Sequence, residues 1–209
     1  FAEFFGQPVM IFHVTCAEAA DTVRRAKARG APIQAETCPH YLFQTAEVLD
    51  RPRMEGAAWM CSPPQREAAD HGALWAALAD GTLDLVSSDH APYRMDATGK
   101  FAAGADAAFP SIANGMPGLQ QRLPLMFDAM VSGGRGGPEA FARLTAEAPA
   151  RAHGLPGKGR IATGADADIT IWNPEAEVEF GTDDMADGAG YNPWAGRLVR
   201  GWPETVISR

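Results

Sequence analysis

Two polar residues of this chain follow short apolar runs, and both are of a type that binds metals or carries protons. His13 comes directly after the run at residues 9–12, and Asp89 follows the run at residues 83–86. Short apolar runs are typical of strands that are covered on both faces of a parallel sheet. In α/β barrels the chemistry lies at the carboxyl ends of such strands. The pattern therefore predicts an imidazole and a carboxylate at the same end of one sheet.

Each of these residues also has a purely structural interpretation. A lone histidine is by default a core residue with its hydrogen bonds satisfied, and an aspartate after serine commonly caps a turn. Placement favours chemistry, because each residue stands where a predicted strand ends and a loop begins. His13 is therefore a candidate metal ligand, and Asp89 is a candidate ligand or proton carrier.

Helical patterns separate the apolar runs. The strands are predicted at residues 9–12, 32–37 and 83–86, and the helices at about 17–29 and 67–80. Strands that alternate with helices imply parallel pairing with right-handed crossovers. Thr15 and Glu18 have the spacing of a capping box, so Thr15 is the predicted N-cap of the first of these helices.

The later part of the chain changes character twice. Residues 94–112 are rich in Gly, Ala and Asp. They exceed the roughly 12–15 residues usual for a structureless connection, which predicts an active-site cover. Lys100, within this loop, matches no motif and receives no role. From about residue 154, turns and alternating residues predict a second, smaller β-rich portion, since alternation indicates a sheet with one solvated face.

Composition excludes several classes of function. The chain has 209 residues, 46% of them hydrophobic, and a formal net charge of −8 with no basic run, so nucleic-acid binding is not expected. No apolar stretch approaches the roughly 20 residues of a membrane span. Three widely spaced cysteines predict neither a disulfide framework nor a zinc cluster, and a reduced, cytoplasmic protein is expected. The residues at both ends of the sequence are typical of the interior of a longer protein.

Five stretches, taken in order, resemble the carboxyl-terminal half of the cyclic-amide hydrolases of the amidohydrolase superfamily. The resemblance is strongest to hydantoinases and dihydropyrimidinases, with allantoinase and dihydroorotase as relatives. The stretches are FHVT at 12–15, ETCPHYL at 36–42, SPP at 62–64, SDHAP at 88–92 and the segment 159–168. The tail YNPW at 191–194 is also similar to hydantoinases. Each stretch alone is a weak signal, whereas the ordered set is specific.

The resemblance implies an α/β fold that is the C-terminal part of a (β/α)8 TIM-like barrel with a small β-sandwich portion. It divides the chain into residues 1–153, a partial barrel, and residues 154–209, a β-rich sandwich portion, both apparently truncated at their outer ends. About five of the eight barrel strands would then lie outside this chain.

The resemblance also implies a binuclear zinc site at the barrel mouth. His13 would be a ligand to one zinc ion, and Asp89 would bind the other and relay a proton. The remaining family ligands, including a carboxylated lysine, would precede residue 1. Ser62 and Asn114 would bind the substrate, although turn chemistry before Pro63 and Gly115 would explain both equally well. His40 and His90 are not expected to be ligands.

The implied reaction is hydrolysis of a cyclic amide C–N bond, by ring opening of a hydantoin or dihydropyrimidine with a zinc-bridging hydroxide. One alternative is an allantoinase or dihydroorotase-like enzyme, favoured by the residues at 39–40 and 88–92. Another is a non-catalytic scaffold related to dihydropyrimidinase, disfavoured because His13 and Asp89 are both present. The isolated fragment is expected to be inactive, and the family resemblance implies a homotetramer.

Overall fold

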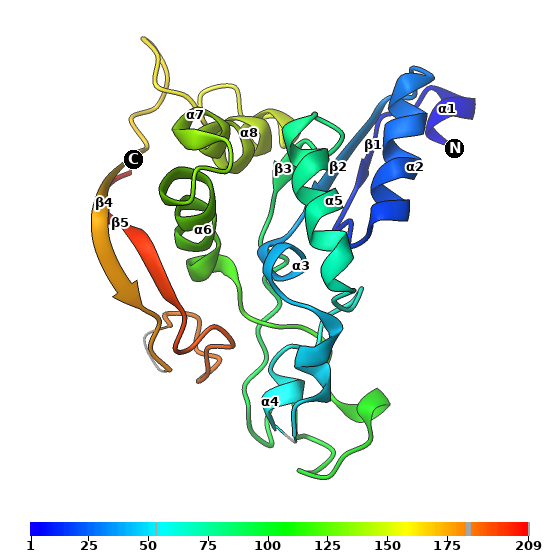
Figure 1. Cartoon of the computed structure of the whole chain (residues 1–209), viewed down its shortest axis with the longest axis vertical. Helices are drawn as coiled ribbons and strands as arrows, with labels where there is room; N and C mark the ends of the chain where they lie inside the picture. The colour runs from blue at the N-terminus through cyan, green and yellow to red at the C-terminus, as the bar shows by residue number, and fades with distance from the viewer. Residues whose placement is uncertain (53, 183–184, 209) are drawn as a thin grey trace.

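Three parallel strands form the sheet on which the first part of the chain is built (Figure 1). They are β1 (Val9–Ile11), β2 (Ile33–Thr37) and β3 (Leu85–Val86), in the order β1-β2-β3. Met10 pairs with Gln34, and Thr37 pairs with Val86. This computed structural model describes residues 1–52, 54–182 and 185–208. The three predicted strands and their parallel pairing are confirmed, and the sheet is open, with no closed barrel in the described residues.

Two helices connect these strands and pack against each other, α2 (Ala17–Ala28) and α5 (Ala68–Ala79). The predicted N-cap of α2 is wrong, because the helix begins after Cys16 and Thr15 makes no cap. The Thr15 hydroxyl is buried and instead accepts a hydrogen bond from Arg66 Nε at 3.1 Å. The first backbone N–H of α2, that of Ala17, donates to Asp70 Oδ1 of α5 at 2.8 Å.

The remaining elements are short. The α-helices are α1 (Ala2–Phe5), α3 (Pro39–Phe43), α4 (Met54–Ala57), α6 (Leu119–Phe127), α7 (Gly137–Ala142) and α8 (Ala148–Ala152). Two 3-10 helices span Ala46–Asp50 and Phe109–Ser111, and π-helical turns at Asp128–Ser132 and Arg143–Glu147 extend α6 and α7. None of the described helices is long and apolar enough to cross a membrane.

The carboxyl-terminal part is one antiparallel ribbon, β4 (Ile169–Glu179) paired with β5 (Leu198–Ile207). The expected sandwich is not formed by the described residues, because a sandwich needs two packed sheets and these strands make one. Instead the ribbon packs on α6 (Figure 1). The Phe127 ring of α6 stacks on Trp172 of β4, with centroids 4.2 Å apart and planes 7° from parallel.

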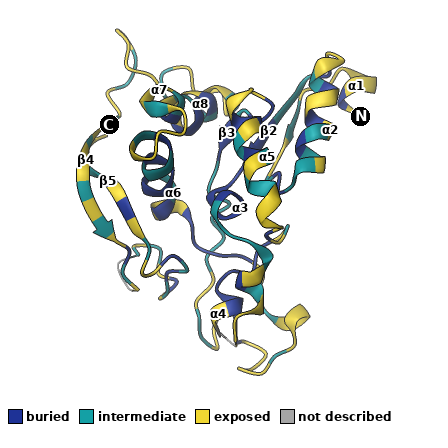
Figure 2. Cartoon of the chain, viewed as in Figure 1, coloured by how far each residue is buried: buried dark blue, intermediate teal, exposed yellow. Residues whose placement is uncertain are grey.

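A single hydrophobic cluster joins the two parts of the chain. It includes Leu74 of α5 and Val86 of β3 together with Phe180, Trp194 and Val199 of the carboxyl-terminal part. Figure 2 shows buried positions in dark blue on β3, α3 and α6, and exposed positions in yellow along α2 and α5. The ribbon is thus packed into the same core as the helices that follow the sheet.

Gly201 makes the approach of the ribbon to α6 possible. Its φ is +99°, and a Cβ atom there would lie 2.1 Å from the Phe127 ring. Gly201→Ala is therefore expected to lower the free energy of unfolding by about 2–4 kcal/mol, from overpacking and left-handed strain. Gly196→Ala is the matched control, because Gly196 has a φ of +81° with nothing within 4 Å of its Cβ position. Urea unfolding should show a clearly smaller loss for the control, and equal losses would contradict the packing argument.

Candidate active site

The polar residues gather where the carboxyl ends of the three strands meet. Beyond the strands, the Val14 N–H donates to the Glu36 carbonyl at 2.8 Å, and the Ser87 N–H donates to the Thr37 carbonyl at 3.0 Å. These bonds prolong the ladder past β1 and β3, so the two segments that follow these strands run alongside the end of β2. His13 lies in the segment after β1 and Asp89 in the segment after β3, one on each side of β2, and both residues are partly buried.

His13 and Asp89 share an unusual backbone conformation. Their φ angles are +42° and +46°, and within the described ranges they are the non-glycine residues with positive φ. Left-handed backbone costs of order 1–3 kcal/mol for a residue with a side chain, and such residues cluster at active sites and ligand clamps. The strain therefore marks these two positions independently of their chemistry.

The Glu36 side chain links the segments that follow β1 and β3. It is the penultimate residue of β2 and only 5% exposed. Its carboxyl group accepts a hydrogen bond from the Ser87 hydroxyl at 2.7 Å and another from the backbone N–H of His13. Burial raises the pKa of Glu36, the two hydrogen bonds oppose that rise, and the nearby Asp89 charge adds to it. The ETCPHYL motif contains Glu36, although the sequence alone indicates no role for this residue.

A buried thiol extends this hydrogen-bonded chain. Because the Ser87 proton points to Glu36, the Cys38 thiol donates to Ser87 Oγ, with the two atoms 3.3 Å apart. Cys38 is fully buried, and burial raises the pKa of its thiol well above the usual range. Cys38 is therefore a neutral donor at physiological pH.

The two other histidines near the site have different surroundings. His40 is 2% exposed, and burial together with the neighbouring His13 lowers its pKa to about 3, so its ring is neutral. Its Nε2 atom has no hydrogen-bond partner among the described residues. His90 accepts the backbone N–H groups of Gly118 and Leu119 at its Nδ1 atom, each at 3.2 Å, and so caps α6.

Ser62 and Asn114 lie on loops that are joined to the Asp89 loop. The Gly115 N–H donates to the Met60 carbonyl at 3.0 Å, and the Ala91 N–H donates to the Met116 carbonyl at 3.1 Å. Both Ser62 and Asn114 are exposed. The backbone therefore brings the loops of three predicted site residues together and leaves the serine and asparagine side chains open to solvent.

Gly115 shows how closely these loops approach. A Cβ atom at this position would lie 2.5 Å from the Ala91 carbonyl oxygen and 3.0 Å from the Tyr93 ring. On the other side, the Tyr41 hydroxyl of α3 donates to the Pro63 carbonyl at 2.7 Å, which ties the Ser62 loop to the end of β2. The loops are thus fixed by packing and hydrogen bonds on both sides.

The donor types at this edge suit zinc, which binds imidazole and carboxylate groups. His13 and Asp89 provide one of each. However, the described part of the chain contains no cluster of three or more His, Cys, Asp or Glu side chains that could hold a metal. Glu36, the other carboxyl group at this edge, is engaged by Ser87 and His13.

Polar side chains at the carboxyl edge of a parallel sheet, whose strands alternate with helices, place this chain among the α/β proteins. Residues 9–209 match the Amidohydrolase family, and the chain belongs to that family. The resemblance stated from the motifs is thereby confirmed at the level of the family.

Curated relatives and solved structures give the same result. The chain is 42% identical to a D-hydantoinase of Ralstonia pickettii and 40% identical to one of Rhizobium radiobacter, in both cases over all 209 residues. A solved D-hydantoinase is 41% identical with a TM-score of 0.93, and a dihydropyrimidinase of Brevibacillus agri is 33% identical with a TM-score of 0.92, each over 99% of this chain. The chain spans about 45% of the length of these relatives.

Proposed function

We propose that this chain is the carboxyl-terminal part of a metal-dependent hydrolase that opens the ring of a hydantoin or a dihydropyrimidine. The observation that carries the proposal is the pair of strained residues, His13 and Asp89, held on either side of β2 and linked through Glu36. The relatives named D-hydantoinase and dihydropyrimidinase supply the substrate class.

The residues of this chain have distinct proposed roles. His13 would bind one zinc ion, and Asp89 would bind a second. Two zinc ions, when bound, would lower the pKa of a water molecule and polarise the amide carbonyl. Asp89 takes the proton from the attacking water and delivers it to the leaving ring nitrogen, which makes the nitrogen a better leaving group.

Substrate binding is proposed for the two exposed loops. Ser62 and Asn114 are accessible, and their loops are hydrogen-bonded to each other and to the Asp89 loop. Backbone and amide groups at these positions would bind the ring carbonyl and nitrogen atoms. The cyclic amide is thereby oriented toward Asp89.

The proposal extends to the architecture of the complete protein. Residues 1–153 would be part of a (β/α)8 barrel, and residues 154–209 would contribute to a β-sandwich. The parts of the relatives that this chain does not cover would supply the other strands and zinc ligands.

The three cysteines form no disulfide in the structure, which supports a cytoplasmic location. Exposed Ile11 and Phe12, at the edge strand β1, support a neighbouring strand from the uncovered part of the barrel. A homotetramer is proposed from the family resemblance alone.

The test is a substrate panel applied to the complete protein as it is expressed. We expect ring opening of hydantoin and dihydrouracil in preference to allantoin and dihydroorotate, with a loss of about 100-fold or more after chelation. Activity should return on addition of zinc. Preference for allantoin or dihydroorotate would select the alternative substrate, and a zinc-loaded protein that opens none of the four rings would indicate a scaffold.

A further inference from the structure

Lys100 is a fully buried charged residue in the long loop at residues 94–112. Its side chain has 0% exposure, whereas lysines are almost never fully buried without a partner of opposite charge. Within the described ranges, Lys100 makes no ion pair. Its ammonium group donates one hydrogen bond, from Nζ to the Ala113 carbonyl oxygen at 2.8 Å. A buried ammonium held by a single carbonyl requires an explanation.

The position of this ammonium relates it to both proposed substrate residues. Ala113 directly precedes Asn114, and the carbonyl that Lys100 contacts belongs to the same peptide as the Asn114 N–H. The charge of Lys100 also reaches the buried thiol of Cys61, which directly precedes Ser62. The ammonium therefore lies behind the two loops that present Ser62 and Asn114.

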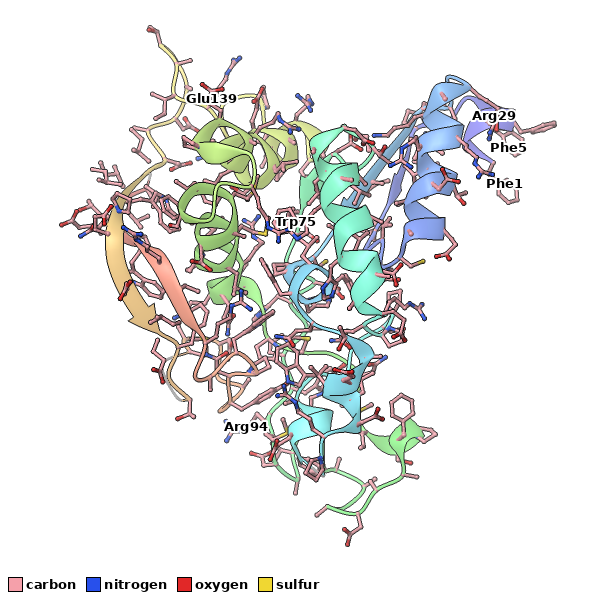
Figure 3. All side chains as sticks on the ribbon, in the orientation of Figure 1. Phe1, Phe5, Arg29, Trp75, Arg94 and Glu139 are labelled. Atoms are coloured by element: carbon pink, nitrogen blue, oxygen red, sulfur yellow. The ribbon has the colours of Figure 1, made fainter. Side chains whose placement is uncertain are left out.

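A compact turn holds Lys100 in this place. The Lys100 backbone N–H donates to the Arg94 carbonyl at 2.8 Å, and the Phe101 N–H donates to the Asp96 carbonyl at 3.0 Å. The Phe101 ring is buried in a small cluster with Met60. Arg94, labelled in Figure 3, donates from its guanidinium to the Gly188 carbonyl at 3.3 Å. The turn is thus anchored on both sides, and the burial of Lys100 is built into the fold.

Burial lowers the pKa of Lys100 to about 8. The ammonium is therefore still the main form at pH 7, although the protein interior disfavours its charge. Residues that carry such a cost are concentrated at functional sites. An ammonium bound to a carbonyl withdraws electron density from the peptide, which makes the N–H of that peptide a stronger donor.

We propose that Lys100 is a positioning residue for the substrate: its buried ammonium orients and polarises the Ala113–Asn114 peptide, so that Asn114 binds the ring carbonyl of a cyclic amide. The inference rests on the proposed ring-opening function. Lys100 contacts neither the substrate nor the reacting atoms, and it acts through Asn114.

The test compares Lys100→Met with the complete wild-type protein, loaded with zinc, on the ring substrate that the wild type opens. We expect KM to rise about tenfold or more, with kcat changed by less than about threefold, because the ring is bound less well. Zinc content should be unchanged. The wild-type KM should also rise with pH through about 8, as the Lys100 ammonium beside the Cys61 thiol loses its proton. The KM of Lys100→Met should not follow that pH dependence.

Thermal stability separates this role from a merely structural one. The folded pKa of Lys100 lies below its ordinary value, so stability from this group is missing at neutral pH and is gained as pH rises above about 8. Lys100→Met should therefore raise the unfolding midpoint at pH 7 and flatten its pH dependence. Lys158→Met is the control, because Lys158 lies outside the loop at 94–112 and is paired with Asp166 and Asp168.

Several results would overturn the inference. An unchanged KM in Lys100→Met would do so, as would a lower unfolding midpoint with a parallel loss of zinc and kcat, which would indicate structural support. Wild-type turnover in the same assay reports on the proposed function alone. A zinc-loaded wild type that opens no ring would overturn both proposals, whereas an active wild type with an unaffected variant would overturn only this one.

Discussion

Asp89→Asn is expected to lower kcat for ring opening by about 10²- to 10⁴-fold, the usual contribution of a general acid–base group. An amide has the size of a carboxyl group but cannot accept the proton of the attacking water. The substitution is also mild for the fold, because asparagine tolerates left-handed backbone better than most residues and Asp89 has a φ of +46°. The loss should therefore appear in kcat without a comparable loss of stability.

Steady-state kinetics and zinc analysis of the same preparations check this expectation. Asp106→Asn is the control, since Asp106 is an exposed carboxylate in the loop at 94–112 and should leave kcat unchanged. If Asp89→Asn retained full zinc content and more than about a tenth of the wild-type kcat, Asp89 would not be the proton relay.

The second large effect is expected at Glu36. Glu36→Ala removes the acceptor of two hydrogen bonds, leaving the partly buried Ser87 hydroxyl and His13 N–H without it. Each orphaned donor costs about 1–3 kcal/mol, so the free energy of unfolding should fall by roughly 2–5 kcal/mol. His13 loses the bond that fixes its strained backbone, and zinc content should fall with it.

Glu36→Gln separates the hydrogen bonds from the packing. Glutamine keeps the size of the side chain and one acceptor oxygen, so its loss in urea unfolding should be smaller than that of Glu36→Ala. The exposed Glu139, labelled in Figure 3, provides the control, and Glu139→Ala should change stability by about 0.5 kcal/mol or less. Equal and small losses for both Glu36 variants would show that this carboxyl group does not hold His13 and Ser87.

The sequence was informative where a local pattern controls the structure. Apolar runs followed by His13 and Asp89 predicted strand ends, because strand burial depends on nearby residues. The cap at Thr15 failed because Arg66, 51 positions away, hydrogen-bonds its hydroxyl. Local spacing cannot report such a competitor.

The sequence alone indicates no role for Glu36 or Lys100, for a related reason. Glu36 contacts both His13 and Ser87 because β2 lies between the segments that follow β1 and β3. Strand order and register are properties of the assembled sheet, so no local pattern predicts this contact. Lys100 lies in a loop without periodicity, where no pattern distinguishes a buried lysine from a solvated one. The sandwich stays a prediction, because one alternating strand indicates a half-buried sheet and does not specify a second layer.

The left-handed backbone at His13 and Asp89 has a consequence for protein engineering. Glycine adopts this conformation freely, and the relief at each position outweighs the roughly 0.4–1 kcal/mol that glycine costs through the unfolded chain. A library sorted only for heat resistance would therefore enrich glycine at 13 and 89. Such a selection would yield more heat-resistant proteins that had lost the two groups proposed to bind zinc and relay the proton, so directed evolution of this chain needs an activity screen at every round.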